Sequence, residues 1–120
     1  MATANRTEVI STQLRQELED LSSSMCKALN DPKRLMVLYT LRDGEYTVGE
    51  LSKLMGIPQS NTSQHLAVLR DRGLVEAERV GNTVLYSLRH PKVLEAVDLL
   101  RDVMGDEISR RQGLRSRYGS

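Results

Sequence analysis

The chain contains no tryptophan and no phenylalanine, and tyrosine, with four copies, is its only large aromatic residue. We therefore expect an aliphatic core and no aromatic platforms on which nucleic-acid bases could stack. The single cysteine, Cys26, excludes an intrachain disulfide framework and any metal site built from several thiolates.

No run of apolar residues is long enough to span a bilayer, and the first residues, MATANRTEV, lack the apolar middle of a signal peptide. We therefore expect a soluble, cytoplasmic protein. The charges nearly cancel, with 17 Lys and Arg against 16 Asp and Glu, so any basic footprint for nucleic acid must be local. The sequence shows no nucleophile with a positioned base, no glycine-rich phosphate loop and no ligand set for a catalytic metal. We therefore expect no enzyme activity and no cofactor.

At 120 residues the chain is long enough for one compact domain, expected over 1–109, but not for two. Apolar residues recur at helical spacing over about 7–24 and about 90–109, which predicts a helix at each end of this domain. The serines at 22–24 are expected to bend or break the first helix before a short second one. Residues 110–120 are basic without apolar periodicity, which predicts a flexible tail that solubilises the protein or adds attraction for phosphate.

Between the two terminal helices, the sequence contains two capping signals that predict helix starts. Asp31 can cap a helix in which Pro32 takes the first position. In TVGELSKLMG, Thr47 and Glu50 match a capping box. The expected inward residues are Leu35, Val37, Leu38 and Leu41 in the first of these helices and Leu51, Leu54 and Met55 in the second. Because Pro58 can begin another helix almost at once, the pattern predicts a helix-turn-helix.

The helix expected over about 58–72 has one apolar face and one polar face. Its inward stripe is Thr62, Leu66 and Leu69, continued by Leu74, and its outward residues are Ser60, Ser63, Gln64 and Ala67, with Gln59 and Asn61 near the exposed N-terminal end. Short polar groups on the leading turn of a second helix suit insertion into a DNA major groove. The helix N-terminus also favours phosphate. A solvated face that merely lacks charge is the alternative interpretation.

A β-hairpin is predicted directly after this helix by GLVEAERVGNTVLYSL, in which two alternating stretches flank Gly81-Asn82. Pairing Val80 with Thr83 gives one apolar face, made of Val75, Ala77, Val84, Tyr86 and Leu88. The hairpin tip then presents Arg79, Asn82 and Thr83. A helix-turn-helix with such a hairpin is a winged helix, whose tip can touch the phosphate backbone. Alternatively, the hairpin only closes the core.

The segments NDPKRLMVL and QSNTSQHLAVLRDRGLV, in that order and followed by the hairpin, resemble the ArsR/SmtB family of winged-helix transcriptional repressors over about 29–88. The resemblance implies a homodimer that binds an operator near its target genes and releases it when a signal arrives. By the resemblance, Gln59, Ser60, Ser63, Gln64 and His65 lie on the DNA-contacting side, with Arg79 on the wing. The predicted DNA-binding set is completed by Asn61, Arg70, Asn82 and Thr83. One departure is Pro58, where many relatives have serine or threonine.

The last helix has a broader apolar arc than one small domain needs. Its stripe is Val93, Val97, Leu100 and Met104, widened by Ala96, Leu99, Val103 and Ile108. We therefore expect part of this arc, with the N-terminal stripe from Ile10 to Leu21, to meet a partner chain, although a core within one chain is the alternative. Two-fold symmetry would place two recognition helices in successive major grooves about 34 Å apart, which predicts an inverted-repeat operator.

The residues do not identify the signal. The thiolate box of the resembled family reads EYTVGEL here, with Thr47 and Gly49 at the cysteine positions. The zinc site of the last helix corresponds to His90, Lys92, Val103 and Asp106, of which lysine and valine cannot be ligands, so no metal is expected. Cys26 could respond to oxidants or link two subunits if it were exposed, but a small buried hydrophobe is the favoured interpretation.

Two classes of function remain. One is a dimeric, sequence-specific DNA-binding repressor, and the other is a winged-helix module that docks protein through the same helix. The near-neutral net charge favours the second. The first is favoured by Arg70, Arg72 and Arg79, which are expected around the polar face, and by the lack of large apolar anchors on it.

Overall fold

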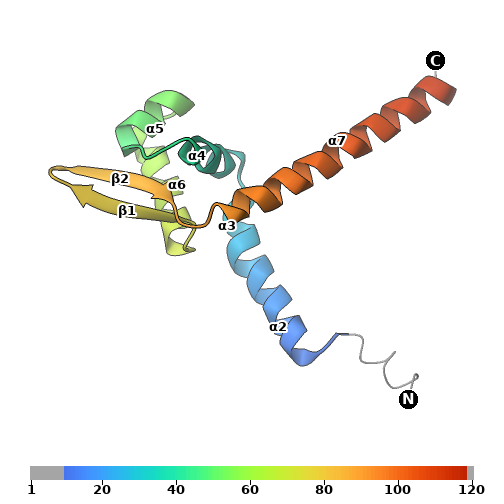
Figure 1. The fold of residues 1–120 in the computed structure, drawn as a ribbon, viewed down its shortest axis with the longest axis horizontal. Coiled ribbons are helices and arrows are strands. Elements are labelled where there is room, and N and C mark those ends of the chain that lie inside the picture. Colours follow the sequence, from blue (N-terminus) through green and yellow to red (C-terminus); the bar gives the residue numbers. More distant parts are fainter. Residues whose placement is uncertain (1–9, 119–120) are drawn as a thin grey trace.

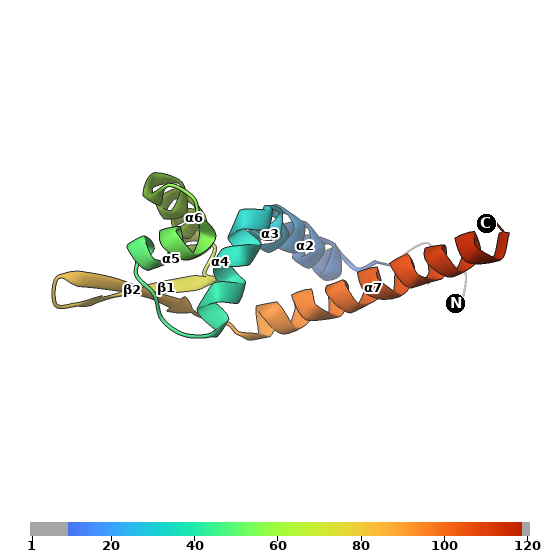
Figure 2. The same cartoon turned by 90° about the horizontal axis from the view of Figure 1, so that it is seen from above.

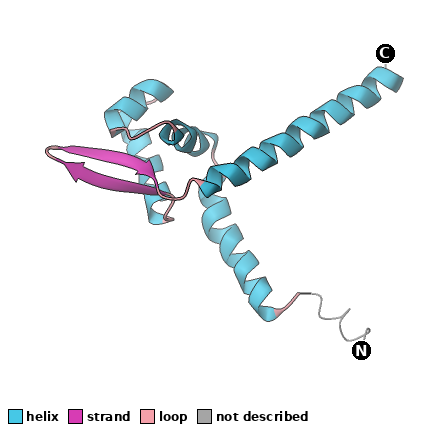
Figure 3. Cartoon of the chain, viewed as in Figure 1, coloured by secondary structure: helices cyan, strands magenta, loops and turns pink. Residues whose placement is uncertain are grey.

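The computed structural model describes residues 10–118, and the side chains of residues 10–113. The elements in chain order are α2 (Thr12–Asp20), the π-helix η1 (Leu21–Cys26), α3 (Lys27–Leu29), α4 (Pro32–Arg42), α5 (Val48–Met55), α6 (Gln59–Asp71), β1 (Val75–Val80), β2 (Thr83–Leu88) and α7 (Lys92–Tyr118). Helices dominate and one antiparallel hairpin accompanies them, as Figure 3 shows. The predicted fold class, mainly α with a small β-hairpin wing, is confirmed.

The molecule consists of a body and two helical arms. α4, α5, α6 and the hairpin form the body, from which α2 and α7 project at the end opposite the wing tip (Figures 1 and 2). The Cα radius of gyration is 19.6 Å. A compact domain of this length would have a radius of about 14 Å. The arms therefore reach well beyond the body that they are attached to.

The body holds an aliphatic core, as the lack of tryptophan and phenylalanine predicts. Its buried members are Ala28, Val37, Leu38, Leu41, Leu51, Leu66, Leu69, Leu74, Val75 and Leu94. Two expectations need correction. Leu54, expected to face inward, is 62% exposed, and Leu94, which was missing from the expected stripe of the last helix, is completely buried. Leu94 lies at the base of α7, where that helix leaves the body.

The helix starts of the body confirm most of the expected signals. The Asp31 carboxylate accepts the amides of Lys33 and Arg34 at 2.8 and 3.2 Å, with Pro32 in the first turn of α4. The capping box of Thr47 and Glu50 is present at α5. The start of α6 differs from the prediction, because Pro58 is the residue before the helix, with φ −59° and ψ 146°, and Gln59 is the first helical residue.

The N-terminal arm is helical through its serine run. α2 begins at Thr12, after Ser11, whose hydroxyl accepts the amide of Leu14 at 3.0 Å. The expected start near residue 7 lies outside the described residues. The chain does not break at 22–24, but the α-helix is interrupted there, because Leu21–Cys26 form a π-helix that runs directly into the short helix α3. The serines therefore lie in a wider helical turn instead of ending the helix.

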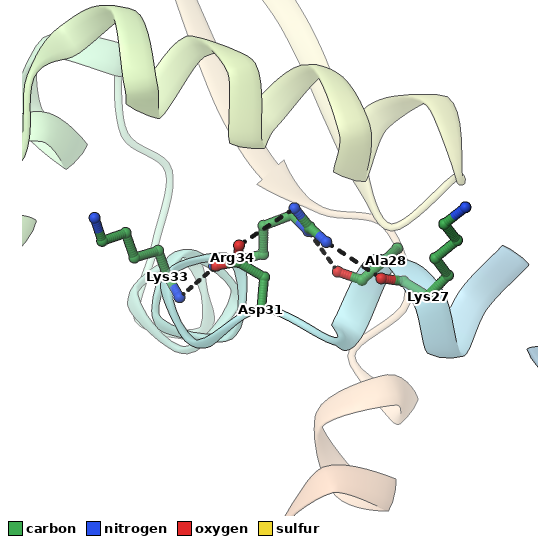
Figure 4. Close-up of polar contacts among 5 residues, drawn as sticks. All are labelled: Lys27, Ala28, Asp31, Lys33 and Arg34. Carbon is green, nitrogen blue, oxygen red and sulfur yellow. Dashed lines mark hydrogen bonds and ion pairs between the residues drawn. The ribbon is translucent and has the colours of Figure 1, made fainter.

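Arg34 fastens this arm to the body, as Figure 4 shows. Its Nε donates to the carbonyl of Ala28 at 2.6 Å, and its Nη2 donates to that of Lys27 at 3.2 Å. The same guanidinium lies 3.6 Å from the Asp31 carboxylate. One side chain of α4 thus binds two carbonyls at the end of α3, where carbonyls have few helical partners. The Lys27 carbonyl also accepts the amide of Asn30 at 3.2 Å.

The C-terminal arm is longer than expected. α7 continues to Tyr118, so residues 110–118 extend the helix instead of forming a separate tail from residue 110. Glu107 pairs with Arg110 and with Arg111, at 3.4 Å from the Nε of the latter, and such pairs one turn apart support the helix across the expected boundary. This end of α7 points away from the wing (Figure 1). Within the described part of the chain, no helix has both the length and the apolar character that a bilayer span requires.

Candidate nucleic-acid interface

The recognition helix, α6, has the two faces that its sequence predicts. Thr62, Leu66 and Leu69 are buried in the interior of the body. The residues exposed on the other side and at the start are Gln59, Ser60, Asn61, Ser63, Gln64 and Ala67. The orientation of this helix is therefore confirmed, and its front half presents amides and hydroxyls to solvent.

The N-terminal end of α6 is open. Among the described side chains none caps it, since Pro58 offers only its carbonyl, which accepts the amide and the hydroxyl of Thr62 at 3.1 and 3.2 Å. The Ser60 hydroxyl lies 3.4 Å from the Asn61 amide oxygen, a long hydrogen bond that leaves both groups able to bind other partners. Uncapped helix amides carry partial positive charge and suit a phosphate group.

The wing has the predicted register. Val80 pairs with Thr83 and Arg79 with Val84 across the turn, and Gly81 has φ +65°, as a hairpin turn with glycine first requires. The side chains of Arg79, Asn82 and Thr83 are exposed at the tip. The wing is long enough for this tip to stand clear of the body (Figure 1).

A backbone bridge that the sequence did not reveal holds the base of the wing. Tyr46 and Tyr86 exchange two backbone hydrogen bonds, at 3.2 and 2.8 Å. Tyr46 precedes α5, so the bridge ties the hairpin to the first helix of the helix-turn-helix. A single residue pair has no repeating pattern by which a strand could be recognised in sequence.

An open hollow of about 550 Å³ lies between the recognition helix and β2. It is lined by Ser63, Leu66, Ala67, Arg70, Asp71 and Tyr86. Arg70 is exposed on the last turns of α6, and Tyr86 belongs to β2. The small side chains of Ser63 and Ala67 leave room in front of the helix. The surface is therefore concave and polar, with Arg70 at one side.

Two predicted positions are less exposed than the residues of this surface. Arg72 donates from Nη1 to the Ser24 hydroxyl at 3.4 Å, and its Nε lies 3.6 Å from the Asp71 carboxylate. It therefore contacts the N-terminal arm, which corrects the expectation that it belongs to the basic cluster around the polar face. His65 is half-buried and lies close enough to Asp31 to influence its carboxylate.

The Asp31 carboxylate shows this influence in its pKa. Burial would raise the pKa, but it is outweighed by the amide hydrogen bonds from Arg34 and Lys33. The charges of His65 and Arg34 lower it further, and the pKa of Asp31 ends below its ordinary value of 3.8. His65 is thus half-buried and within electrostatic reach of the start of α4, whereas its neighbour Gln64 is exposed.

The described residues contain no group of three or more His, Cys, Asp or Glu side chains that could hold a metal ion. Cys26, favoured from sequence as a buried hydrophobe, is exposed in the single chain, which corrects that interpretation. It lines a shallow hollow with Ser22, Lys27, Leu29, Asn30 and Leu100. The thiol therefore lies where the N-terminal arm faces the first exposed turns of α7.

Comparison with known proteins gives consistent matches. The family model for the bacterial regulatory proteins of the arsR family matches residues 31–77. The biofilm growth-associated repressor of Xylella fastidiosa is 35% identical over 103 residues, which cover 83% of this chain and 90% of that protein.

Solved structures of other proteins resemble this chain both in fold and in sequence. The crystal structure of Rv0081 from Mycobacterium tuberculosis is 37% identical, with a TM-score of 0.70, and the match covers 78% of this chain and 95% of that one. The solution structure of a homodimeric winged helix-turn-helix DNA-binding domain from Mycobacterium bovis is 28% identical, with a TM-score of 0.71, covering 84% and 93%.

The segment matched by the family model begins at the cap of α4 and ends in β1, so it contains the whole helix-turn-helix. Identity above one third extends over nine-tenths of the length of a relative. The chain belongs to the arsR family of bacterial regulatory proteins.

Proposed function

We propose that the protein is a homodimeric, sequence-specific DNA-binding transcriptional repressor that leaves its operator in response to a signal. The observation that carries this proposal is the front half of α6, where five exposed residues with hydroxyl or amide side chains stand beside an exposed wing and an uncapped helix end. Family membership and the names of the relatives, a repressor among them, support it.

Base reading is assigned to the outward residues of α6. Gln59, Asn61 and Gln64 carry amides that can bond bidentately to adenine in the major groove. Ser60 and Ser63 add hydroxyl groups that bond either to a base or to phosphate. The short side chains allow the helix to approach the bases closely.

Phosphate contacts are assigned to the surroundings of that helix. Arg70 lies beside the hollow and Arg79 lies on the wing, with Asn82 and Thr83 at its tip. Such contacts position a protein on the duplex without reading its sequence. His65, which lies on the flank of α6 near Asp31, is assigned to the edge of the interface.

Dimerisation is assigned to the two arms. The apolar side chains exposed on them are Ile10, Leu14, Leu18 and Leu21 in the first and Leu99, Leu100, Val103, Met104 and Ile108 in the second. Those of α7 are 51–66% exposed, which is costly in water unless a partner covers them. A two-fold dimer presents two recognition helices about 34 Å apart, and the operator is then an inverted repeat.

We further assign the protein to the cytoplasm, where it acts on DNA without membrane, cofactor or catalysis. Cys26 is the only cysteine of the chain, and its exposure beside α7 meets one requirement of a redox-sensitive residue.

A second candidate function is a winged-helix module that docks protein. It is favoured by the net charge of +1 and by Leu54 and Val68, which are exposed on the two helices of the helix-turn-helix. The polar front of α6 favours DNA, because helix-in-groove docking of protein relies on large apolar anchors on the docking face.

The test is a gel-shift titration against the duplex upstream of the protein's own gene, at about 50 and about 200 mM salt, with a random duplex of equal length as control. We expect saturable binding to one inverted repeat, preferred over the random duplex at both salt concentrations. Equal affinity for every duplex, or no binding, would overturn sequence-specific recognition and favour the protein-docking module.

A further inference from the structure

A polar cluster joins α7 to the body at one point. The hydroxyl of Tyr39 in α4 donates to Oδ1 of Asp98 in α7 at 2.6 Å. Arg42, also in α4, donates from Nη2 to Oδ2 of the same carboxylate at 2.8 Å. Arg101, one turn further along α7, donates to Oδ1 at 3.3 Å. Both oxygens of Asp98 are therefore bound, and two of the three donors come from another helix.

The tyrosine ring is part of the same cluster. The guanidinium carbons of Arg42 and Arg101 lie over the ring of Tyr39, at 5.0 and 5.3 Å from its centroid. At these distances each cation is attracted to the ring face. The hydrogen bond from Tyr39, followed by that from Arg42, lowers the pKa of Asp98 below its ordinary value, because both donors stabilise the charged carboxylate. Carboxylate, phenol and both guanidinium groups thus restrain one another.

The cluster lies where apolar contact between α7 and the body ends. Leu94 and Val97 are the buried residues of α7, and from Asp98 to residue 113 no described residue is buried. Asp98 follows Val97 directly. Among the described side chains, the Asp98 cluster is the last hydrogen-bonded contact between α7 and the body beyond the short apolar base of the helix. From there α7 projects away from the body (Figures 1 and 2).

Direction matters here because α7 is long. From Asp98 to the end at Tyr118 the helix extends by about 30 Å, so a rotation of about 10° at the cluster moves its end by about 5 Å. In a dimer built on the arms, the same rotation moves the bodies instead. α4, which carries Tyr39 and Arg42, also packs directly against the recognition helix α6. Tilting α4 relative to α7 therefore shifts α6 relative to the two-fold axis.

We propose that Asp98 is a positioning residue which, through Tyr39 and Arg42, fixes the angle between α7 and the body and thereby sets the spacing of the two recognition helices in the dimer. The inference rests on the proposed function. Exposed ion pairs add little to stability, but charge-assisted hydrogen bonds are short and directional. The cluster is therefore suited to holding an angle and contributes little to keeping the chain folded.

The variant Asp98→Asn keeps the shape of the side chain and removes its charge. Tyr39→Phe removes a single hydroxyl and provides a second, milder disruption. The matched control is Asp102→Asn, one turn further along α7, where the carboxylate is exposed and forms no ion pair with the described residues. All three are compared with the wild type for dimerisation by analytical ultracentrifugation, and we expect the same dimer in each.

The first readout is the distance between two spin labels at Ser63→Cys, one per protomer, in a Cys26→Ser background, measured by double electron–electron resonance without DNA. We expect one narrow distance distribution in the wild type and the control, and a broadened or shifted one in Asp98→Asn. The second readout is affinity for inverted repeats whose half-site spacing is changed by one base pair. The wild type and Asp102→Asn should prefer one spacing, whereas Asp98→Asn should bind that spacing about tenfold more weakly and lose most of the preference.

The inference is overturned if Asp98→Asn and Tyr39→Phe give the same label distances and the same spacing preference as the wild type. If the wild type shows a narrow label distance but binds no inverted repeat in preference to random DNA, the proposed function fails while the distance readout still decides whether Asp98 fixes the angle. A loss of binding without any change in label distance would also count against positioning, because it would mean that Asp98 acts on DNA by another route.

Discussion

The body and the arms of this protein handle their apolar side chains in opposite ways. In the body, leucines such as Leu51, Leu66 and Leu69 are 0–1% exposed. In the arms, beyond the base of α7 where Leu94 is buried, leucines are left in solvent, with Leu14 41% and Leu100 63% exposed. None of the nine described residues of α2 is buried. The body therefore has its own buried core, whereas the apolar side chains of the arms are not covered within the single chain.

Because of this difference, folding of the single chain and assembly of the dimer depend on different side chains. A buried leucine contributes to the stability of the single chain, while an exposed leucine of an arm contributes only when a second chain covers it. The two regions meet at polar contacts on α4, where Arg34 binds the N-terminal arm and Tyr39 and Arg42 bind the C-terminal one. Changes in the body, the arms and the junctions should therefore have three distinct signatures.

The largest expected effect is on folding. Leu51→Ala removes a completely buried side chain and should lower the free energy of unfolding by about 2–5 kcal/mol, measured by urea denaturation at low protein concentration. The matched change Leu100→Ala should cost much less at that concentration and more as the concentration rises. Equal losses from both variants at every concentration would break the distinction between body and arm.

The next effect is on assembly. The double variant Leu100→Glu, Val103→Glu places two charges in the exposed apolar arc of α7 and should weaken dimerisation by about a hundredfold or more, with unchanged far-ultraviolet circular dichroism. Leu54→Glu is the control, because Leu54 in the body is equally exposed, at 62%. Sedimentation should show a monomer in the first case and a dimer in the second. If both remain dimeric, the α7 arc is not the dimer surface.

A smaller effect is expected on DNA binding, where residues of α6 and of the wing should behave differently. Gln64→Ala should remove about 1–3 kcal/mol of discrimination at one base position, because an amide that reads a base edge is lost. Arg79→Ala should weaken binding to all duplexes alike and reduce the dependence of log Kd on log salt by about one unit. Titrations of both variants against the operator and a scrambled duplex measure these quantities. An unchanged salt dependence in Arg79→Ala would remove the wing from the DNA contact.

The smallest effect concerns the cap of α4. Asp31→Ala should lower the free energy of unfolding by about 1 kcal/mol, because the amides of Lys33 and Arg34 lose their acceptor, and Asp31→Asn should lose less. The folded pKa of Asp31 lies below 3.8, so its charge contributes fully above that pH and the contribution is lost as the pH falls through the lower, folded value. Urea titrations of the wild type and Asp31→Asn should therefore diverge at neutral pH and converge in acid.

Features set by neighbouring residues could be predicted from the sequence. The cap at Asp31, the capping box at Thr47 and the glycine-first turn at Gly81 all depend on a few consecutive residues, and the structure contains each of them. The two faces of α6 follow in the same way from helical spacing. The predicted outward direction of Ser63 and Gln64 needed no knowledge of the rest of the fold.

Features that depend on residues far apart in the chain could not be predicted from the sequence. Arg72 turns to Ser24 and Tyr39 binds Asp98 across 48 and 59 positions of chain, and no local pattern marks either pair. Leu94 was missed because the apolar arc of α7 is so broad that its inner and outer sides look alike in sequence. Exposure of Cys26 depends on where the arms point, which only the assembled fold determines.

The most direct measurement is a hydroxyl-radical footprint on an operator selected from random duplexes by the wild-type protein. Two exposed α6 helices in one dimer should protect two symmetry-related patches about one helical turn apart, with two protomers bound per duplex. Substituting Gln64 in both protomers should change the selected bases within both patches. A single patch bound by one protomer, or uniform protection of any sequence, would contradict the account.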